Sequence, residues 1–119
     1  MDRPAFDLED RTLAFAKAVR TFVRKLPRTI SNIEDVKQLV RSSGSVGANY
    51  IEANESFSHK DFHYRVKISR KEAKESRFWL NLLFTSDVDE LEQSRAELVR
   101  EATELMNIFG AILRNSPVS

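Results

Sequence analysis

Apolar and small side chains recur at alternating steps of three and four residues along four separate segments of the chain. In the first segment the recurring positions are Leu8, Thr12, Phe15, Val19, Phe22 and Leu26. Steps of three and four residues bring side chains onto one face of an α-helix, so each segment predicts an amphipathic helix with one face turned to a core. No segment shows the every-second-residue pattern of a strand, so we expect an all-α fold.

The connections between these segments are short and carry residues that end or start helices. Pro27 ends the first segment, because the residue before a proline is pushed out of the α-helical region. Asn32 is the expected N-cap of the second helix, and Ser58 with Asp61 forms a capping pattern for the third. We therefore expect one domain with frayed ends and with helices over residues 8–26, 33–56, 59–84 and 88–114. Four long helices joined by short turns favour an up-down-up-down antiparallel four-helix bundle.

The second expected helix contains an unusual concentration of small residues between Arg41 and Glu52. A glycine inside a helix costs about 1 kcal/mol relative to alanine, and close packing against a neighbouring helix offsets such a cost. A glycine-rich phosphate loop would have to follow a strand, which this sequence does not predict. We expect the second and third helices to be closest neighbours, with a close-packing surface made of Ser43, Gly44, Gly47, Ala48 and Ala73.

Three charged residues on or near the apolar faces need partners or access to water. Glu52 and Glu75 are expected to be polar partners between the second and third helices, with Glu52 meeting Arg41 or Arg77, or hydrogen-bonding Asn49 or a serine hydroxyl across the helix pair. Arg95 interrupts the apolar face of the fourth helix. We expect its stem to lie along the edge of the core while its head reaches water.

The net charge of +1 conceals strongly basic and strongly acidic helices. Residues 11–28 hold six basic and no acidic side chains, residues 60–77 hold seven basic against three acidic, and residues 87–104 hold seven acidic against two basic. Nucleic-acid binding needs several Lys or Arg side chains on one surface. The candidates are Lys17, Arg20, Arg24, Lys67, Arg70, Lys71 and Lys74. The alternative is that the basic helices face the acidic one, within the bundle or across a subunit contact, in ion pairs worth up to about 1 kcal/mol each.

Residue patterns that support catalysis or metal binding are missing. Without cysteine the chain has neither a disulfide nor a thiolate metal site. His59 and His63 are the only histidines, and neither follows a glutamate by three residues or lies near the serines of the second helix. We expect no catalytic residues, no metal, no cofactor and no enzymatic activity. No apolar run suits a signal peptide or a membrane span, so the cytoplasm is the default location and a membrane is not an expected partner.

The third expected helix has more apolar width than one core-facing stripe requires, because Phe78, Trp79 and Leu82 add to it. Trp79 has two interpretations, as part of the core or as an anchor in a contact between subunits, where large aromatic side chains concentrate. We favour the subunit contact, which predicts a homo-oligomer.

Several motifs in the second and third helices resemble those of one protein family. They are Arg41-Ser42-Ser43-x-Ser45-Val46-Gly47-Ala48-Asn49-Tyr50-Ile51-Glu52-Ala53, Asp61-Phe62, Lys71-Glu72-Ala73-x-Glu75-Ser76 and Trp79-Leu80. The combination resembles the small four-helix-bundle proteins encoded within intervening sequences of bacterial 23S ribosomal RNA genes, which are similar to the accessory variability protein of diversity-generating retroelements.

This resemblance implies an assembly and a set of partners. It implies a homo-oligomer, often a pentameric ring with basic surfaces. In the retroelement relatives it implies binding to RNA or DNA and to a reverse transcriptase. It implies no catalytic residues. A module that binds other proteins and has no nucleic-acid role is the competing function.

Overall fold

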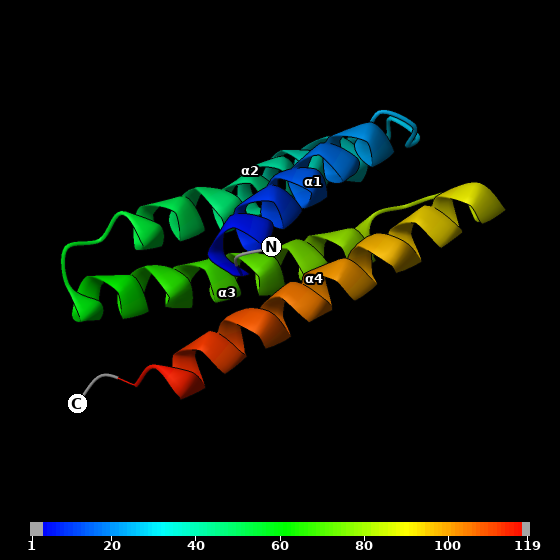
Figure 1. The fold of residues 1–119 in the computed structure, drawn as a ribbon. Helices are drawn as coiled ribbons and strands as arrows, with labels where there is room; N and C mark the ends of the chain where they lie inside the picture. The colour runs from blue at the N-terminus through cyan, green and yellow to red at the C-terminus, as the bar shows by residue number, and fades with distance from the viewer. Residues whose placement is uncertain (1–3, 118–119) are drawn as a thin grey trace.

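The chain folds into four α-helices in the computed structural model, which describes residues 4–117 and the side chains of residues 8–117. The helices are α1 (Pro4–Val23), α2 (Ile30–Asn54), α3 (His59–Leu82) and α4 (Asp89–Asn115). No strand forms within residues 4–117, and the expectation of an all-α, up-down-up-down four-helix bundle is confirmed (Figure 1). None of the described helices combines the length and the apolar character needed to cross a membrane.

Successive helices lie side by side, and α4 returns beside α1 to close the bundle (Figure 1). α2 and α3 share the most extensive contact, as the small residues of both helices predict, whereas α1 and α4 share the smallest. The backbones of α1 and α3 do not approach each other, because these helices occupy opposite corners. Side chains that point outward from α1 and from α3 therefore lie on different sides of the molecule.

The core draws on all four helices. Val19, Leu39, Val66, Leu80 and Phe109, which together represent every helix, are all completely buried. Full burial of a side chain of this size contributes about 1.5–3 kcal/mol. Tyr50 of α2 also reaches across the core to Phe109 of α4, with 5.7 Å between the ring centroids.

Two of the predicted helix starts have different outcomes. The predicted cap of α3 is confirmed, because the Ser58 hydroxyl accepts a hydrogen bond from the Asp61 amide at 3.1 Å. The prediction of Asn32 as the cap of α2 is wrong. Thr29 is the N-cap and accepts from the Asn32 amide at 3.1 Å, so α2 begins at Ile30.

Asn32 instead links the turn between α1 and α2 to the turn between α3 and α4, at one end of the bundle. Its side-chain amide donates to the carbonyl oxygens of Pro27 at 2.9 Å and Phe84 at 2.8 Å. Its side-chain oxygen accepts from the Phe84 amide at 2.9 Å. Asn32 is only 2% exposed and lies within the first turn of α2, three residues after the Thr29 cap, so its side chain bonds to the two turns rather than capping the helix.

The prediction that the Arg95 head reaches water is also wrong. The guanidinium donates to the carbonyl oxygens of Leu80, at 3.3 Å, and Leu83, and it forms an ion pair with Glu92. The last carbonyls of a helix have no partner within the helix, so Arg95 satisfies the end of α3. A hydrogen bond from the Thr85 hydroxyl, with the nearby Arg95 charge, lowers the pKa of Glu92 below its usual value.

Candidate functional site

A row of basic side chains runs along α3 at alternating steps of three and four residues. Its members are Lys60, His63, Lys67, Arg70, Lys74 and Arg77. This spacing places them on one side of the helix, and Lys71 lies beside them. We define the α3 basic face as the five exposed cations of this side, which are Lys60, Lys67, Arg70, Lys71 and Lys74. The rings of Tyr64 and Phe78 are also exposed on this side of α3.

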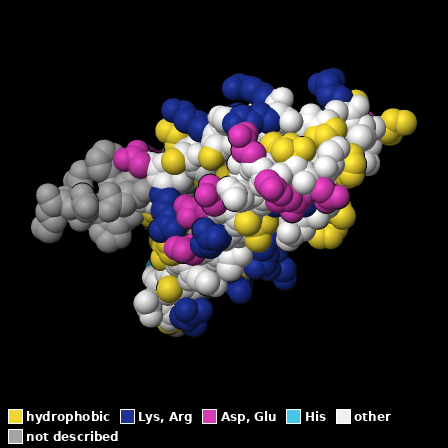
Figure 2. Space-filling model, turned by 90° about the vertical axis from the view of Figure 1, so that its right-hand side faces the viewer, with side chains coloured by type: hydrophobic (Ala, Val, Ile, Leu, Met, Phe, Trp, Pro, Cys, Tyr) yellow, Lys and Arg dark blue, Asp and Glu magenta, His cyan; other side chains and the backbone are white. Residues whose placement is uncertain are grey.

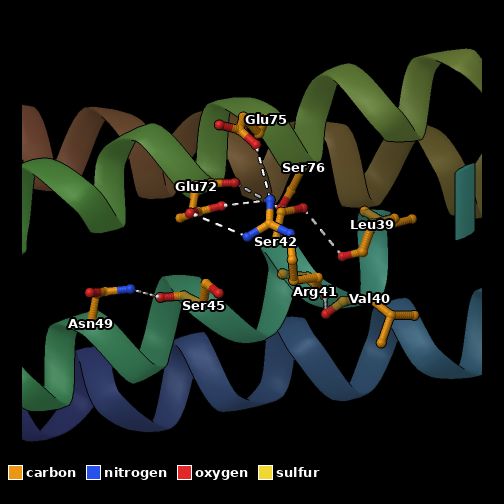
Figure 3. A network of polar contacts seen from close by, with 10 residues as sticks. Leu39, Val40, Arg41, Ser42, Ser45, Asn49, Glu72, Glu75 and Ser76 are labelled. Carbon is orange, nitrogen blue, oxygen red and sulfur yellow. Dashed lines mark hydrogen bonds and ion pairs between the residues drawn. The ribbon is translucent and has the colours of Figure 1, made fainter. Parts of the chain in front are cut away.

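The glutamates of α3 point the other way, toward α2. Arg41 of α2 extends between two carboxylates of α3, with Glu75 at 3.2 Å and Glu72 at 3.5 Å (Figure 3). Glu75 therefore has the interhelical polar role that the sequence predicts. Glu52 does not meet Arg41 or Arg77 and is exposed, because Arg41 turns to α3 and Arg77 donates to Thr103.

This division leaves the α3 basic face without carboxylate partners. Within residues 8–117, no Asp or Glu side chain lies within 4.0 Å of its five cations. The sequence left open that basic residues form ion pairs with the acidic α4. In the structure, such pairs are made by residues of α1 and of the turn after it. There Arg11 holds Glu101 at 2.7 Å and Glu104 at 2.9 Å, and Lys25 lies 3.8 Å from Glu90. The Glu101 hydrogen bonds raise the pKa of Arg11 above its ordinary value.

The structure does not place all seven predicted nucleic-acid contacts on one surface. Lys17 and Arg24 are exposed on and just after α1, at the corner opposite α3. Arg20 is half-buried, donates to the Ala16 carbonyl at 3.1 Å and lies against Gly44 of α2. The other four, Lys67, Arg70, Lys71 and Lys74, share the α3 basic face.

Sequence reasoning missed one addition to these cations, Arg114 of α4. Its guanidinium and that of Arg70 both cross Gly110, where an added Cβ would lie 3.3 Å from Arg114 Nη1 and 3.9 Å from Arg70 Nε. Both arginines therefore lie beside Gly110, and neighbouring like charges repel each other unless an anion lies near them. Gly110 was the available signal, since the missing side chain makes room for both arginines.

The small residues of α2 pack against two different helices. Ser43 and Ala73 are completely buried, and Gly44 is partly buried. Gly47 lies against α1, because an added Cβ would stand 2.7 Å from Thr12 Oγ1. The inclusion of Ala48 in the close-packing surface is wrong, since its position on α2 is exposed.

Serines, rather than the glycines, form the close contact between α2 and α3. The hydroxyls of Ser42 and Ser76 lie 2.9 Å apart, and Ser69 donates to the Val46 carbonyl at 2.9 Å. All three serines are completely buried. Their small size lets the helices approach, and their hydroxyls all have hydrogen-bond partners.

The apolar side chains proposed for a subunit contact differ in exposure. Trp79 is partly buried and packs against the core, whereas 56% of Phe78 and 51% of Leu82 are exposed. Several other large apolar residues are exposed at the end of the bundle where Asn32 links the two turns. They are Ile30, Ile33, Phe84 and Val88. Figure 2 looks onto this end and shows apolar side chains exposed among acidic ones, with Lys and Arg mainly along the borders.

The two histidines, His59 and His63, lie in the first turns of α3. Among the described residues, no three or more His, Asp or Glu side chains are grouped so that they could hold a metal ion. His59 Nε2 instead lies 3.0 Å from the Ser116 carbonyl oxygen and 3.1 Å from that of Pro117.

Comparisons with known proteins agree with the resemblance found in the motifs. The sequence profile of the 23S rRNA-intervening sequence protein family matches residues 6–111. A crystal structure of a protein of unknown function from the S23 ribosomal protein family of Bacteroides thetaiotaomicron is similar, with a TM-score of 0.79 and 28% sequence identity. The match covers 92% of this chain and 97% of that one. No curated protein matches the sequence.

Proposed function

Because the chain belongs to the 23S rRNA-intervening sequence protein family, we propose that it is a non-enzymatic, cytoplasmic protein that binds RNA or DNA through the α3 basic face. The observation that supports this most directly is the separation of charge on α3. Five exposed cations occupy one side, while the carboxylates Glu72 and Glu75 pair with Arg41 on the other. Cations without carboxylate partners are free to neutralise phosphates.

The dimensions of this face suit a nucleic-acid strand. From Lys60 to Lys74 the helix rises about 21 Å, at 1.5 Å per residue. A strand following the helix would meet a cation on nearly every turn. The exposed rings of Tyr64 and Phe78 add surfaces on which unpaired bases can stack, an interaction that does not depend on base identity.

Assembly would multiply this face. We infer a homo-oligomer, with a pentameric ring as the form that the family resemblance implies. The exposed apolar side chains around Leu82 and Phe84 support it, since apolar groups gathered on a surface mark protein contacts. A ring presents one α3 basic face per subunit, so a long strand can bind several at once with much greater overall affinity.

We expect light scattering at micromolar concentration to give a mass several times the 13.7 kDa of one chain. Leu82→Asp with Phe84→Asp should reduce that mass, because the two charges would be buried in the contact. Exposed Leu13→Asp, on α1, is the matched control and should leave the mass unchanged. A folded wild-type monomer would contradict the inferred oligomer.

Charge reversal on α3 tests the nucleic-acid role. We expect Lys67→Glu, Lys71→Glu and Lys74→Glu together to weaken binding of a fluorescent oligonucleotide at least about 10-fold near physiological salt. The slope of log affinity against log salt concentration should also become less negative by about two. Each phosphate contact to a single strand contributes about 0.7 to this slope, and three contacts are lost. Fluorescence anisotropy across a salt series measures both quantities.

A control variant with the same charge change separates this face from the overall charge. Lys17→Glu, Arg24→Glu and Arg28→Glu also remove three exposed cations, but near α1. We expect this variant to lose much less affinity than the α3 variant. Equal losses would show that net charge, not the α3 face, determines binding, and failure of the wild-type oligomer to bind at low salt would refute the proposal.

A second candidate function, a protein-binding module without a nucleic-acid role, is favoured by an open groove of about 530 Å³ between α1 and α4. Its lining is mainly apolar or small, with Ala14, Phe15, Ala18, Phe22 and Leu98 among the residues. This volume falls within the usual range for binding sites, and the groove is open to an apolar side chain of a partner. Absence of oligonucleotide binding at low salt would favour this function.

A further inference from the structure

A second hollow lies where the first turns of α3 meet the end of α4, and it is distinct from the open groove beside α1. Its volume is about 470 Å³, and its lining residues are Lys60, His63, Tyr64, Lys67, Leu113 and Pro117. Lys60 and Lys67 belong to the α3 basic face, so the hollow continues that face at one end. It is large enough for a nucleotide, since small-molecule sites commonly measure about 300–1,000 Å³.

Positive charge is concentrated around this hollow. Arg70 follows Lys67 by about one turn of α3, and Arg114 directly follows Leu113 of α4, so both arginines come from helix turns that adjoin the lining residues, and both lie beside Gly110. None of the six lining residues is acidic. Within residues 8–117 no carboxylate lies within 4.0 Å of the surrounding cations. The cluster therefore favours an anion of more than one charge.

The far wall of the hollow is held in place by hydrogen bonds. With its proton on Nε2, His59 donates to the carbonyl oxygens of Ser116 at 3.0 Å and Pro117 at 3.1 Å. These bonds tie the residues that follow α4 to the start of α3. Leu113 and Pro117 then form an apolar side opposite the cations.

We propose that this hollow binds the phosphate monoester at the end of a nucleic-acid strand. The inference rests on the proposed function, because the strand itself would lie along the α3 basic face. A terminal monoester carries a charge of about −1.5 to −2 and three acceptor oxygens, whereas each internal phosphate carries only one charge. Cations gathered at one point suit the monoester, and cations spaced along the helix suit the internal phosphates. Tyr64, which lines the hollow, offers its ring to the terminal base.

Oligonucleotides that differ only at their ends test this assignment. Anisotropy competition would use one single-stranded sequence with a 5′-phosphate, with a 3′-phosphate, with two hydroxyl ends, and in circular form. We expect one phosphorylated form to bind about 10-fold more tightly than the hydroxyl form, as one added charge-assisted contact provides. The circular form should bind like the hydroxyl form.

Variants locate the preference in the hollow. Lys60→Gln with Arg114→Gln should bring the affinities for the phosphorylated and hydroxyl forms to the same value. Lys71→Gln, on the α3 basic face outside the hollow, should weaken both forms equally and keep their ratio. If the double variant does not fold, the comparison of ends on the wild-type protein still decides the assignment.

The outcomes separate this inference from the proposed function. Equal affinity of the wild-type protein for all four forms would overturn the strand-end assignment and leave nucleic-acid binding intact. Absence of binding by every form would overturn both. Adenosine monophosphate or inorganic phosphate binding as tightly as the phosphorylated strand would assign the hollow to a free phosphate and overturn its role at strand ends.

Discussion

Replacement of Gly47 with leucine is expected to destabilise the bundle by about 3 kcal/mol or more. Even a methyl group at this position would stand 2.7 Å from Thr12 Oγ1 and 3.1 Å from Thr12 Cβ. Thr12 is 1% exposed and β-branched, and its hydroxyl donates to the Glu9 carbonyl, so it has no room to turn aside. A leucine must therefore push α1 away from α2, and overpacking of this kind commonly costs about 1–3 kcal/mol or more. Urea unfolding at a fixed protein concentration measures the change.

Gly44 provides a matched control in the same helix. A Cβ at Gly44 would meet only Arg20 Nη2, at an ordinary 3.5 Å. We expect Gly44→Ala to raise the free energy of unfolding by up to about 1 kcal/mol, because alanine is the better helix former. Thr12→Ala should restore part of the stability that Gly47→Leu removes, by the logic of a double-mutant cycle. A stable Gly47→Leu protein would mean that this face of α2 is not packed against α1.

Replacement of Asn32 with aspartate is expected to cost about 2–4 kcal/mol at neutral pH. The change keeps the size of the side chain and its bond to the Phe84 amide, but it removes both donors. A carboxylate oxygen would then face the carbonyl oxygens of Pro27 and Phe84, which are 2.9 and 2.8 Å from the present nitrogen. Unpaired buried acceptors cost about 1–3 kcal/mol each, and a buried charge costs more. We expect the melting temperature at neutral pH to fall by roughly 10 °C, which thermal unfolding measures.

Asn49→Asp is the control for the Asn32 substitution. The Asn49 side chain is partly exposed, donates only to the Ser45 carbonyl one turn earlier, and accepts from Arg65. Aspartate there would keep a favourable contact with Arg65, so we expect a change within about 0.5 kcal/mol. Similar losses for the two variants would show that the link between the two turns contributes little to stability.

The sequence alone predicted the bundle because its main determinants are local. The three-and-four spacing decides which face of each helix is buried, and the Ser58 cap depends on residues three positions apart. Such patterns need no knowledge of the rest of the chain. The alternation of long helices and short turns then leaves one simple topology.

The errors came from side chains whose partners are distant in sequence. Asn32 has the residue type of an N-cap, but its partner Phe84 lies 52 positions away. Arg95 was expected to extend its guanidinium to water, but the guanidinium donates instead to carbonyl oxygens at the end of α3. Both residues satisfy backbone groups that only the assembled bundle brings close to them.

The candidate site was predicted only in part for the same reason. The basic residues of α3 could be placed on one face by spacing alone, but spacing could not show that α1 lies at the opposite corner. Gly110 was the only sequence signal for Arg114, and its meaning depends on Arg70, which lies on a different helix. A surface built from two helices is visible only when both are in place.

The small contact between α1 and α4 has a consequence for how the chain folds as it is made. α2, α3 and α4 pack with their immediate neighbours in sequence, and short-range contacts of this kind form quickly. Of the four helices, α1 leaves the ribosome before the others, yet one of its two partners, α4, is the last of the four to be synthesised. The apolar face of α1 can therefore pack only against α2 until α4 has been synthesised. We therefore expect the docking of α1 onto α4 to be the step that completes the bundle.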